Sequence, residues 1–345
     1  MPIGDGEHWV IMGRPESGYS VKVRSAARFK GVPHEWVDRS RRNEKLFQSH
    51  AKVQLIPLVF RPDGSSTQDS TPILDELEKA FPTPSFHPED PALRLLSIVL
   101  EEYGDEWVNK LMFHHRWGCA ADRKVRSTTL ARGMLEGSPL RILSPIVARF
   151  VVRRMVPRMA FAGANTNNRP LLLESWANLV EDLEAHLSRR PYLFGARPAY
   201  GDFGLFGQLD QAFLDPTCGA HLRAHGPSVV AWIERMRHPK VEGDFEVFAS
   251  LEPTLRTIFS REVGPRFLAW GVANERAVAA GAPNTELEMD GRLYYQRTFK
   301  YPAVGLARLR KAFAAVSEEK GLRRFLDETR CLDPLEEQGT NPSSH

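Results

Sequence analysis

The sequence predicts an α+β protein in which a small α/β domain precedes a mainly helical one. Strand-like and helix-like patterns alternate over the first eighty residues, a proline-rich linker follows at about 81–91, and helical periodicities dominate the rest. At 345 residues the chain is long enough for two cores. Its composition, 42% apolar and 26% charged, is that of a folded globular protein.

The N-terminal elements follow the order βαβ, loop, ββα, which makes a complete small α/β layer. Short apolar strands are predicted at 9–12, 35–37 and 55–60, the last ending at an Asp63-Gly64 turn. Helices are predicted at about 20–30 and 71–81. In the first helix the residues predicted to face the core are Val23, Ala26, Ala27 and Phe29, and those predicted to face away are Lys22, Arg24, Ser25 and Arg28.

The helical domain is predicted to contain four main helices, at 92–117, 172–187, 202–214 and 227–237. Residues 118–168, which hold the basic and apolar stretch 149–159, are interpreted as an insertion. The helix at 92–117 carries four aromatic side chains that are expected in the core, the alternative being that they line an apolar substrate pocket: Tyr103, Trp107, Phe113 and Trp117.

The last eighty residues form a further predicted unit. A helix at about 264–280 leads to a hairpin centred on Asp290-Gly291, which is a strong type I′ turn signal, and a helix at 303–320 follows. We expect this unit to pack onto the helical domain, because an isolated hairpin is marginally stable in water. The predicted domains are therefore 7–83, 90–260 with the insertion, 261–330, and a disordered tail at 331–345.

Charge and cysteine content exclude several classes of protein. The 46 basic residues nearly cancel the 43 acidic ones, so the net charge does not indicate binding to nucleic acid or to a membrane. Any basic surface that binds a partner must therefore be local. The three cysteines, Cys119, Cys218 and Cys331, have no paired spacing, which fits a reducing compartment. No signal peptide or membrane span is indicated, so a cytoplasmic location is expected. Metal binding by the neighbouring histidines His114 and His115 is disfavoured, and no metal is predicted.

Three local features carry candidate chemistry, and each has a purely structural alternative. Pro57 inside an apolar strand suits either an edge strand or a cis bond at a strand start beside a ligand. Asp69 and Ser70 precede a helix, where they either cap it or help to bind a carboxylate. Ser17 lies between the first strand and the first helix, where a hydroxyl is either a helix cap or a ligand contact.

Taken together, these features resemble the N-terminal domain of the glutathione transferases, a thioredoxin-like fold. The resemblance rests on the stretches 16–24, 30–35, 55–57 and 69–74, and the bacterial, zeta and omega types are the most similar. It implies that Ser17 faces the glutathione sulfur and that the backbone of Ile56, before a cis Pro57, pairs with the cysteinyl part. The γ-glutamyl end would be held by Asp69 and Ser70.

A second stretch, 190–203, resembles the helical-domain signature of the same family, in which a capping serine or threonine stands three residues before an aspartate. Ala199 occupies the capping position here, so only the Asp202 half of the capping box remains. The missing cap costs about 1 kcal/mol. The resemblance covers roughly residues 8–255; nothing beyond 260 matches, and Pro72 replaces a small residue.

The resemblance implies an enzyme that activates the glutathione thiolate for attack on a small electrophile, with glutathione as co-substrate. Detoxification and a homodimer are common in the family. The alternative is a non-catalytic module of the same fold, in which the insertion and the C-terminal unit bind a partner. The arginines from Arg141 to Arg158 suit either a membrane surface or anionic partner or a solvated helix face.

Overall fold

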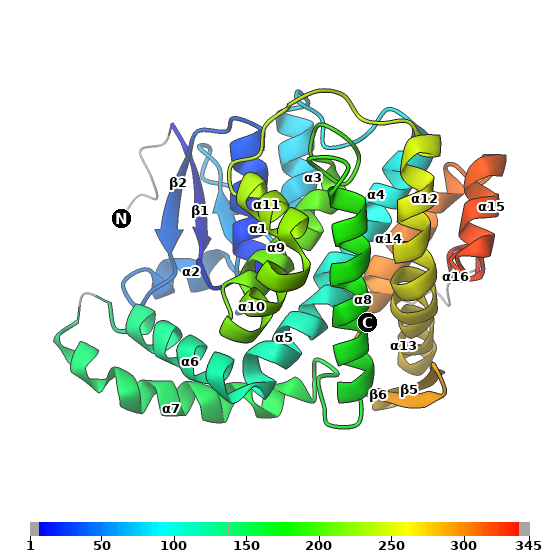
Figure 1. Cartoon of the computed structure of the whole chain (residues 1–345). Coiled ribbons are helices and arrows are strands. Elements are labelled where there is room, and N and C mark those ends of the chain that lie inside the picture. The colour runs from blue at the N-terminus through cyan, green and yellow to red at the C-terminus, as the bar shows by residue number, and fades with distance from the viewer. Residues whose placement is uncertain (1–6, 137, 338–345) are drawn as a thin grey trace.

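A computed structural model describes residues 7–136 and 138–337 of the chain. Figure 1 shows a small sheet at one side of the molecule, with helices making up the remainder. The thioredoxin-like N-terminal domain and the helical C-terminal domain form an α+β fold, as the sequence predicts. None of the helices in the described residues combines the length and apolar character that crossing a bilayer requires.

The N-terminal domain contains a four-stranded mixed sheet in the order β2-β1-β3-β4. Strand β1 pairs with β2 in parallel and with β3 antiparallel. The predicted strand at 55–60 is shorter than expected, because the peptide bond before Pro57 is cis and pairing begins only at Leu58. The bounds are β1 Trp9–Gly13, α1 Gly18–Phe29, β2 His34–Asp38, α2 Glu44–His50, β3 Leu58–Phe60, β4 Ser66–Gln68 and α3 Ser70–Ala80.

Helix α1 is buried on two sides rather than one. Its predicted core face is confirmed, and Gly31 ends the helix with a φ of 65°. The prediction that Lys22 and Ser25 face away from the core is wrong, since both are buried. The reason is tertiary: α1 also packs against α9 of the helical domain, and Ser25 Oγ donates to the carbonyl of Met236 at 2.6 Å.

The helical domain begins with one continuous helix, as predicted, although its middle turn is π-helical. Three of its four aromatic side chains are fully buried, which confirms their core role: Tyr103, Trp107 and Trp117. The bounds of the main helices are α4 Pro91–Tyr103, η1 Gly104–Val108, α5 Asn109–Gly118, α8 Arg169–Leu187, α9 Tyr200–Phe213, α10 Pro216–His225 and α11 Pro227–Met236.

Glycines let helix α9 pack closely against α4 of its own domain and against α1 of the N-terminal domain. A Cβ at Gly204 would lie 2.6 Å from the backbone of Glu101 in α4, and one at Gly207 would lie 2.6 Å from the carbonyl oxygen of Gly18 in α1. Real Cβ atoms do not approach this closely, so the backbones can meet only where the side chain is absent. The position of the sheet relative to the helical domain depends on this close approach.

Residues 120–159 form a helical hairpin with α6 Ala120–Met134, η2 Pro139–Leu143, α7 Ser144–Met155 and η3 Pro157–Met159. Figure 1 shows it extending from the end of α5 beneath the sheet domain, with α7 on the outer side. Two contacts fix its base to the start of α10. Asp122 Oδ1 accepts from the Thr217 amide at 2.7 Å, and Arg126 pairs with Asp215.

The C-terminal unit starts from a helix that runs without a break through α12 Phe248–Ile258, η4 Phe259–Leu268 and α13 Ala269–Ala279. Its π-helical middle contains Pro265, which has no N–H for the α-helical ladder. The predicted hairpin is confirmed, since Asp290 and Gly291 both have positive φ. The remaining bounds are β5 Asn284–Met289, β6 Arg292–Arg297, α14 Tyr301–Ala314, α15 Lys320–Glu328 and α16 Leu332–Glu336.

This unit packs onto the helical domain, as expected, through α14 against α4 and η4 against α8. The predicted helix at 303–320 ends earlier, at Ala314, and a separate helix α15 follows. The prediction of a disordered tail at 331–345 is wrong for its first part, because Cys331 and Leu335 are buried against the unit's core. Residues 338–345 lie outside the described residues.

The half capping box at α9 is confirmed. Asp202 is fully buried, and its carboxylate accepts from the amides of Ala199 and Leu193, both at 2.9 Å, and from the indole of Trp232 at 2.8 Å. Ala199 has the extended backbone of a helix N-cap but no side-chain acceptor. One carboxylate therefore holds the helix start, the preceding loop and α11.

We predict that Asp202→Ala lowers the free energy of unfolding by about 3–5 kcal/mol, because three buried donors lose their acceptor. Ala199→Ser is expected to raise it by about 0.5–1 kcal/mol by completing the box. Urea denaturation measures both changes, with the exposed Asp327→Ala as control. A loss at Asp202 no larger than at Asp327 would refute this role.

Candidate functional site

The sheet register brings the predicted site residues to one edge of the sheet. Met12, near the end of β1, lies opposite Leu58 at the start of β3, and Leu58 lies opposite Gln68 at the end of β4. The segments that adjoin these residues carry the candidate groups at that edge: Ser17, Ile56, Pro57, Asp69 and Ser70. Residues as far apart in sequence as Ser17 and Ser70 thus line a single sheet edge.

Ser17 is the N-cap of α1. Side chains of the helical domain fix the loop that precedes it. The Oγ of Ser17 accepts from the Ser20 amide at 3.3 Å. The loop before it is fixed by Gln211 Nε2, which donates to the Pro15 carbonyl at 2.8 Å, and by Arg116, which donates to the Glu16 carbonyl at 3.4 Å. The capping role weighed from the sequence is therefore real, and it leaves the hydroxyl proton of Ser17 without an acceptor in the described residues.

Tyr19, two residues after Ser17, carries the other hydroxyl that we weigh as a donor to the thiol, and it already has an acceptor. Its hydroxyl donates at 2.9 Å to the main-chain carbonyl of Asp105, in the π-helical turn η1. Burial, together with the nearby acids Glu106 and Asp105, raises the pKa of Tyr19 well above its usual value, so the hydroxyl stays protonated. Of the two hydroxyls, only that of Ser17 has its proton available to a ligand.

Ile56 presents unpaired backbone groups at the same edge. The Ile56–Pro57 bond is cis, as predicted. Within the described residues, neither the amide nor the carbonyl of Ile56 has a hydrogen-bond partner. An unpaired N–H and C=O on one residue is the arrangement that a peptide-like ligand can pair with as an added strand.

Asp69 has a backbone conformation that is costly for a residue with a side chain. Its φ is 87° and its ψ 133°, a region that glycine favours, and such residues concentrate at ligand sites. Its Oδ2 accepts from the hydroxyl of Tyr301, at the start of α14, at 2.5 Å. The second oxygen, Oδ1, has no partner in the described residues and is open to an ammonium group.

The side chain of Ser70 does not face a ligand in the way the resemblance implies. It is buried, and its Oγ accepts from Lys22 Nζ at 3.4 Å and donates to Asp105 Oδ2 at 3.3 Å. What Ser70 can still offer a carboxylate is its amide at the start of α3, where helix N–H groups are unpaired.

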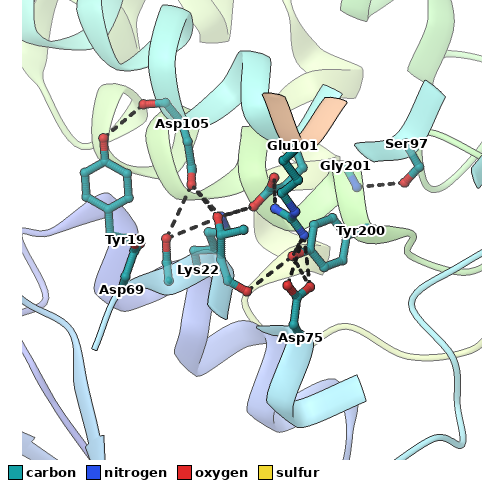
Figure 2. A network of polar contacts seen from close by, with 12 residues as sticks. Tyr19, Lys22, Asp69, Asp75, Ser97, Glu101, Asp105, Tyr200 and Gly201 are labelled. Atoms are coloured by element: carbon teal, nitrogen blue, oxygen red, sulfur yellow. Dashed lines mark hydrogen bonds and ion pairs between the residues drawn. The ribbon is translucent and has the colours of Figure 1, made fainter. Parts of the chain in front are cut away.

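Lys22 is the centre of a buried polar network that sequence reasoning missed (Figure 2). Its ammonium lies 2.6 Å from Glu101 Oε1 and 2.6 Å from Asp105 Oδ2. Thr71, on α3, donates to Glu101 Oε1 at 2.7 Å. The network therefore ties α1 and α3 of the N-terminal domain to α4 and η1 of the helical domain.

The charge state of Lys22 follows from its surroundings. Burial by itself lowers the pKa of the ammonium, but Asp105 and Glu101 raise it by more, so the net pKa lies above its ordinary value. Lys22 is therefore protonated at neutral pH. The positive charge of Lys22 also offsets the negative charges of the Glu101 and Asp105 carboxylates.

The C-terminal unit contributes a second cation to the network. Arg308, on α14, donates to Asp75 Oδ1 at 3.0 Å and to the Tyr200 hydroxyl at 2.9 Å, and it lies 3.6 Å from Glu101 Oε2. Figure 2 shows Glu101, Tyr200 and Asp75 converging on one side of the network. Through Arg308 and Tyr301, the C-terminal unit therefore contacts both the polar network and Asp69.

Two hollows in the described surface are lined by other residues. One of about 280 Å³ is lined by Val21 and Arg28 of α1 with Phe206 of α9. The other, of about 430 Å³, is lined by Asn178 of α8 and Arg266 of η4. Neither is lined by a predicted site residue. At the candidate site itself, the Tyr301 side chain contacts Asp69.

Comparison with known proteins finds matches in both domains. The model of the glutathione S-transferase N-terminal domain matches residues 12–85, and that of the C-terminal domain matches residues 145–235. The second match begins inside the stretch predicted as an insertion. A probable glutathione S-transferase from Solanum tuberosum is 30% identical over 98 residues, which are 28% of this chain and 45% of the relative.

A probable glutathione S-transferase from Nicotiana tabacum is 29% identical over 100 residues, 28% of this chain and 44% of the relative. The chain thus spans about half of the length of these curated relatives. Among solved structures, the β-etherase LigF from Sphingobium sp. strain SYK-6 has a TM-score of 0.45 at 18% identity, covering 66% of this chain and 94% of that one.

The two matches come in the predicted order, and the first includes the residues of this edge. The chain therefore carries an N-terminal and a C-terminal domain similar to those of the glutathione S-transferases.

We predict that Lys22→Met lowers the free energy of unfolding by about 3–5 kcal/mol, because Glu101 and Asp105 would remain buried without a cation. The loss should depend on pH. Burial raises the pKa of Asp105 and Lys22 opposes that shift, so removing Lys22 raises this folded-state pKa further. A carboxyl whose pKa is higher in the folded than in the unfolded state makes the protein less stable as pH rises. The free energy of unfolding of the variant should therefore be lower at pH 8 than at pH 5.

Urea denaturation at the two pH values measures this effect. Lys124→Met, which removes an exposed lysine on α6, is the matched control and should change stability by no more than about 0.5 kcal/mol. A pH-independent loss would show that Lys22 matters by packing rather than by charge.

Proposed function

We propose that the protein binds glutathione at this sheet edge and joins its thiolate sulfur to a small electrophile. The observation that carries the proposal is the convergence of open groups there: the Ser17 proton, the Ile56 backbone and Asp69 Oδ1. They match a thiol, an extended peptide backbone and an ammonium group, which are the parts of glutathione. The similarity of both domains to glutathione S-transferases supports the same assignment.

The chemistry requires a thiolate at neutral pH. A free thiol has a pKa of about 8.5, and lowering it by about two units takes roughly 2.7 kcal/mol. A charge-assisted hydrogen bond from Ser17 contributes about 1.5–3 kcal/mol, and the N-terminus of α1 adds a favourable partial charge. The thiol proton leaves to solvent, a sulfur lone pair forms the bond to carbon, and the leaving group departs with its electrons.

Transfer to carbon is favoured over disulfide reduction. A reductase of this fold needs a cysteine that forms a mixed disulfide with glutathione, and position 17 is serine. Cys218 and Cys331 are buried, and burial raises the pKa of both thiols, Cys331 to about 12. Neither has the exposed thiolate that exchange requires.

Retention on immobilised glutathione, with elution by free glutathione, tests the binding half of the proposal. A screen of haloaromatic, epoxide, peroxide and disulfide substrates then tests the reaction. Retention without turnover on any of these would favour the non-catalytic module, and failure to bind would remove the proposal. The cytoplasmic location and the homodimer stay predictions, the latter open to sedimentation analysis.

We predict that Ser17→Ala leaves glutathione affinity nearly unchanged and lowers turnover at neutral pH by about ten- to a hundredfold. The physical reason is a raised pKa of the bound thiol, so much of the loss should return as pH rises. Steady-state rates across pH 6 to 9 measure this effect.

The matched control is Tyr19→Phe, whose hydroxyl proton is engaged by Asp105. It should destabilise the domain contact slightly without moving the pH profile. If Tyr19→Phe abolishes turnover at neutral pH and Ser17→Ala does not, the thiol faces Tyr19 instead.

We also predict that Tyr301→Phe weakens glutathione affinity about three- to tenfold with little change in the maximal rate. Its hydroxyl holds Asp69 Oδ2 and so aims Oδ1 toward the ammonium. Calorimetric titration with glutathione measures this effect, and Tyr295→Phe on β6 serves as control. Tighter binding in Tyr301→Phe would mean that Tyr301 competes with glutathione for Asp69.

A further inference from the structure

The outer face of α7 is both apolar and basic, and nothing in the proposed reaction uses it. Ile142 is 83% exposed, and Ile146 and Phe150 are each 63% exposed. Within α7, positions 146, 149, 150 and 153 fall on one side of the helix, since 149 and 150 each lie three or four residues from 146 and from 153. Ile142 lies just before α7, in the 3₁₀ turn η2. Arg149 and Arg153 therefore stand among these apolar side chains.

The opposite face of α7 is the one that packs. Ala148 and Val151 are buried, and α7 contacts α6 and the short 3₁₀ turns on either side of it. Figure 1 shows α7 as the outermost helix on this side of the molecule. The exposed face is thus a continuous surface presented by a hairpin whose base is fixed.

Charge in this region is strongly one-sided. Residues 119–168 hold nine basic residues against two acidic ones, Asp122 and Glu136, whereas the rest of the chain is net acidic. Asp122 is buried, and no acidic residue occurs from position 138 to 173. In the described residues none of the arginines at 141, 149, 153 and 154 forms an ion pair with a protein carboxylate.

We propose that this face of the α6–α7 hairpin docks onto an anionic membrane surface. A helix with large apolar side chains at its centre and arginines among and beside them lies in the interface of a bilayer, with the apolar groups below the headgroups and the guanidinium groups at the phosphates. Ile142, Ile146 and Phe150 would enter the acyl boundary. The proposal does not depend on glutathione chemistry.

Other occupants fit the face less well. A second copy related by a two-fold axis would place the same arginines opposite one another with no carboxylate between them, which is repulsive. A nucleic acid would pair with the arginines but leave isoleucine and phenylalanine side chains exposed to water. A lipid surface satisfies the charged and the apolar groups together.

The test is co-sedimentation of the full chain with vesicles. We expect binding to vesicles that contain phosphatidylserine, weaker binding to those of phosphatidylcholine alone, and a loss of binding as salt rises. The double variant Arg149→Glu/Arg153→Glu should lose at least about tenfold in affinity. The double variant Ile146→Ser/Phe150→Ser should lose a similar factor.

Matched controls change charge and apolar surface elsewhere. Arg41→Glu/Arg42→Glu reverses two exposed arginines of the N-terminal domain, and Leu293→Ser removes an exposed apolar side chain of β6. Circular dichroism establishes that each variant is folded. Equal binding to neutral and anionic vesicles, or variants of α7 that bind like the controls, would overturn the proposal. So would self-association that is lost in Ile146→Ser/Phe150→Ser without any vesicle binding.

Discussion

The fold and the candidate site both depend on one buried cation. Lys22 has no exposed surface, and it joins carboxylates of the helical domain to hydroxyls of the N-terminal domain. Burying an ammonium without partners is prohibitive, so this lysine can be accommodated only when α4 and η1 deliver Glu101 and Asp105. The two domains therefore fix each other's positions at the sheet edge that carries Ser17 and Asp69.

The same network explains why the C-terminal unit is integral to this chain. Arg308 adds a positive charge beside Glu101, and Tyr301 reaches the strained Asp69. Strain of this kind costs about 1–3 kcal/mol and persists only where the surroundings hold it. In this protein part of that support comes from a segment more than two hundred residues away in sequence.

Local patterns were enough to predict much of the fold. Strand and helix periodicity, the Asp290-Gly291 turn and the half capping box at Asp202 are local signals, and the structure confirms them. Pro57 could be singled out because proline conflicts with a strand interior. Helix α2 was missed because Glu44–His50 has too few apolar residues to show a helical period. The ordered start of the tail, residues 331–337, was missed because its order depends on the burial of Cys331 and Leu335 against distant residues.

The site was harder to predict, because its residues are set by contacts between distant segments. Amphipathic reasoning placed Lys22 on the solvent face of α1, since it could not include α9 as a second packing partner. Ser70 was expected to face a ligand, yet Lys22 and Asp105 draw its hydroxyl inward. Tyr301 and Arg308 gave no local signal at all.

The central claim is that glutathione lies along the edge formed by Ser17, Ile56 and Asp69. A crystal structure of the full chain grown with glutathione tests it most directly. Our account predicts the glutathione sulfur within about 3.5 Å of Ser17 Oγ. It also predicts both backbone groups of Ile56 paired with the cysteinyl part, and the ammonium at Asp69 Oδ1. Glutathione bound elsewhere, or a sulfur that meets Tyr19 while Ser17 serves only as the cap of α1, would contradict it.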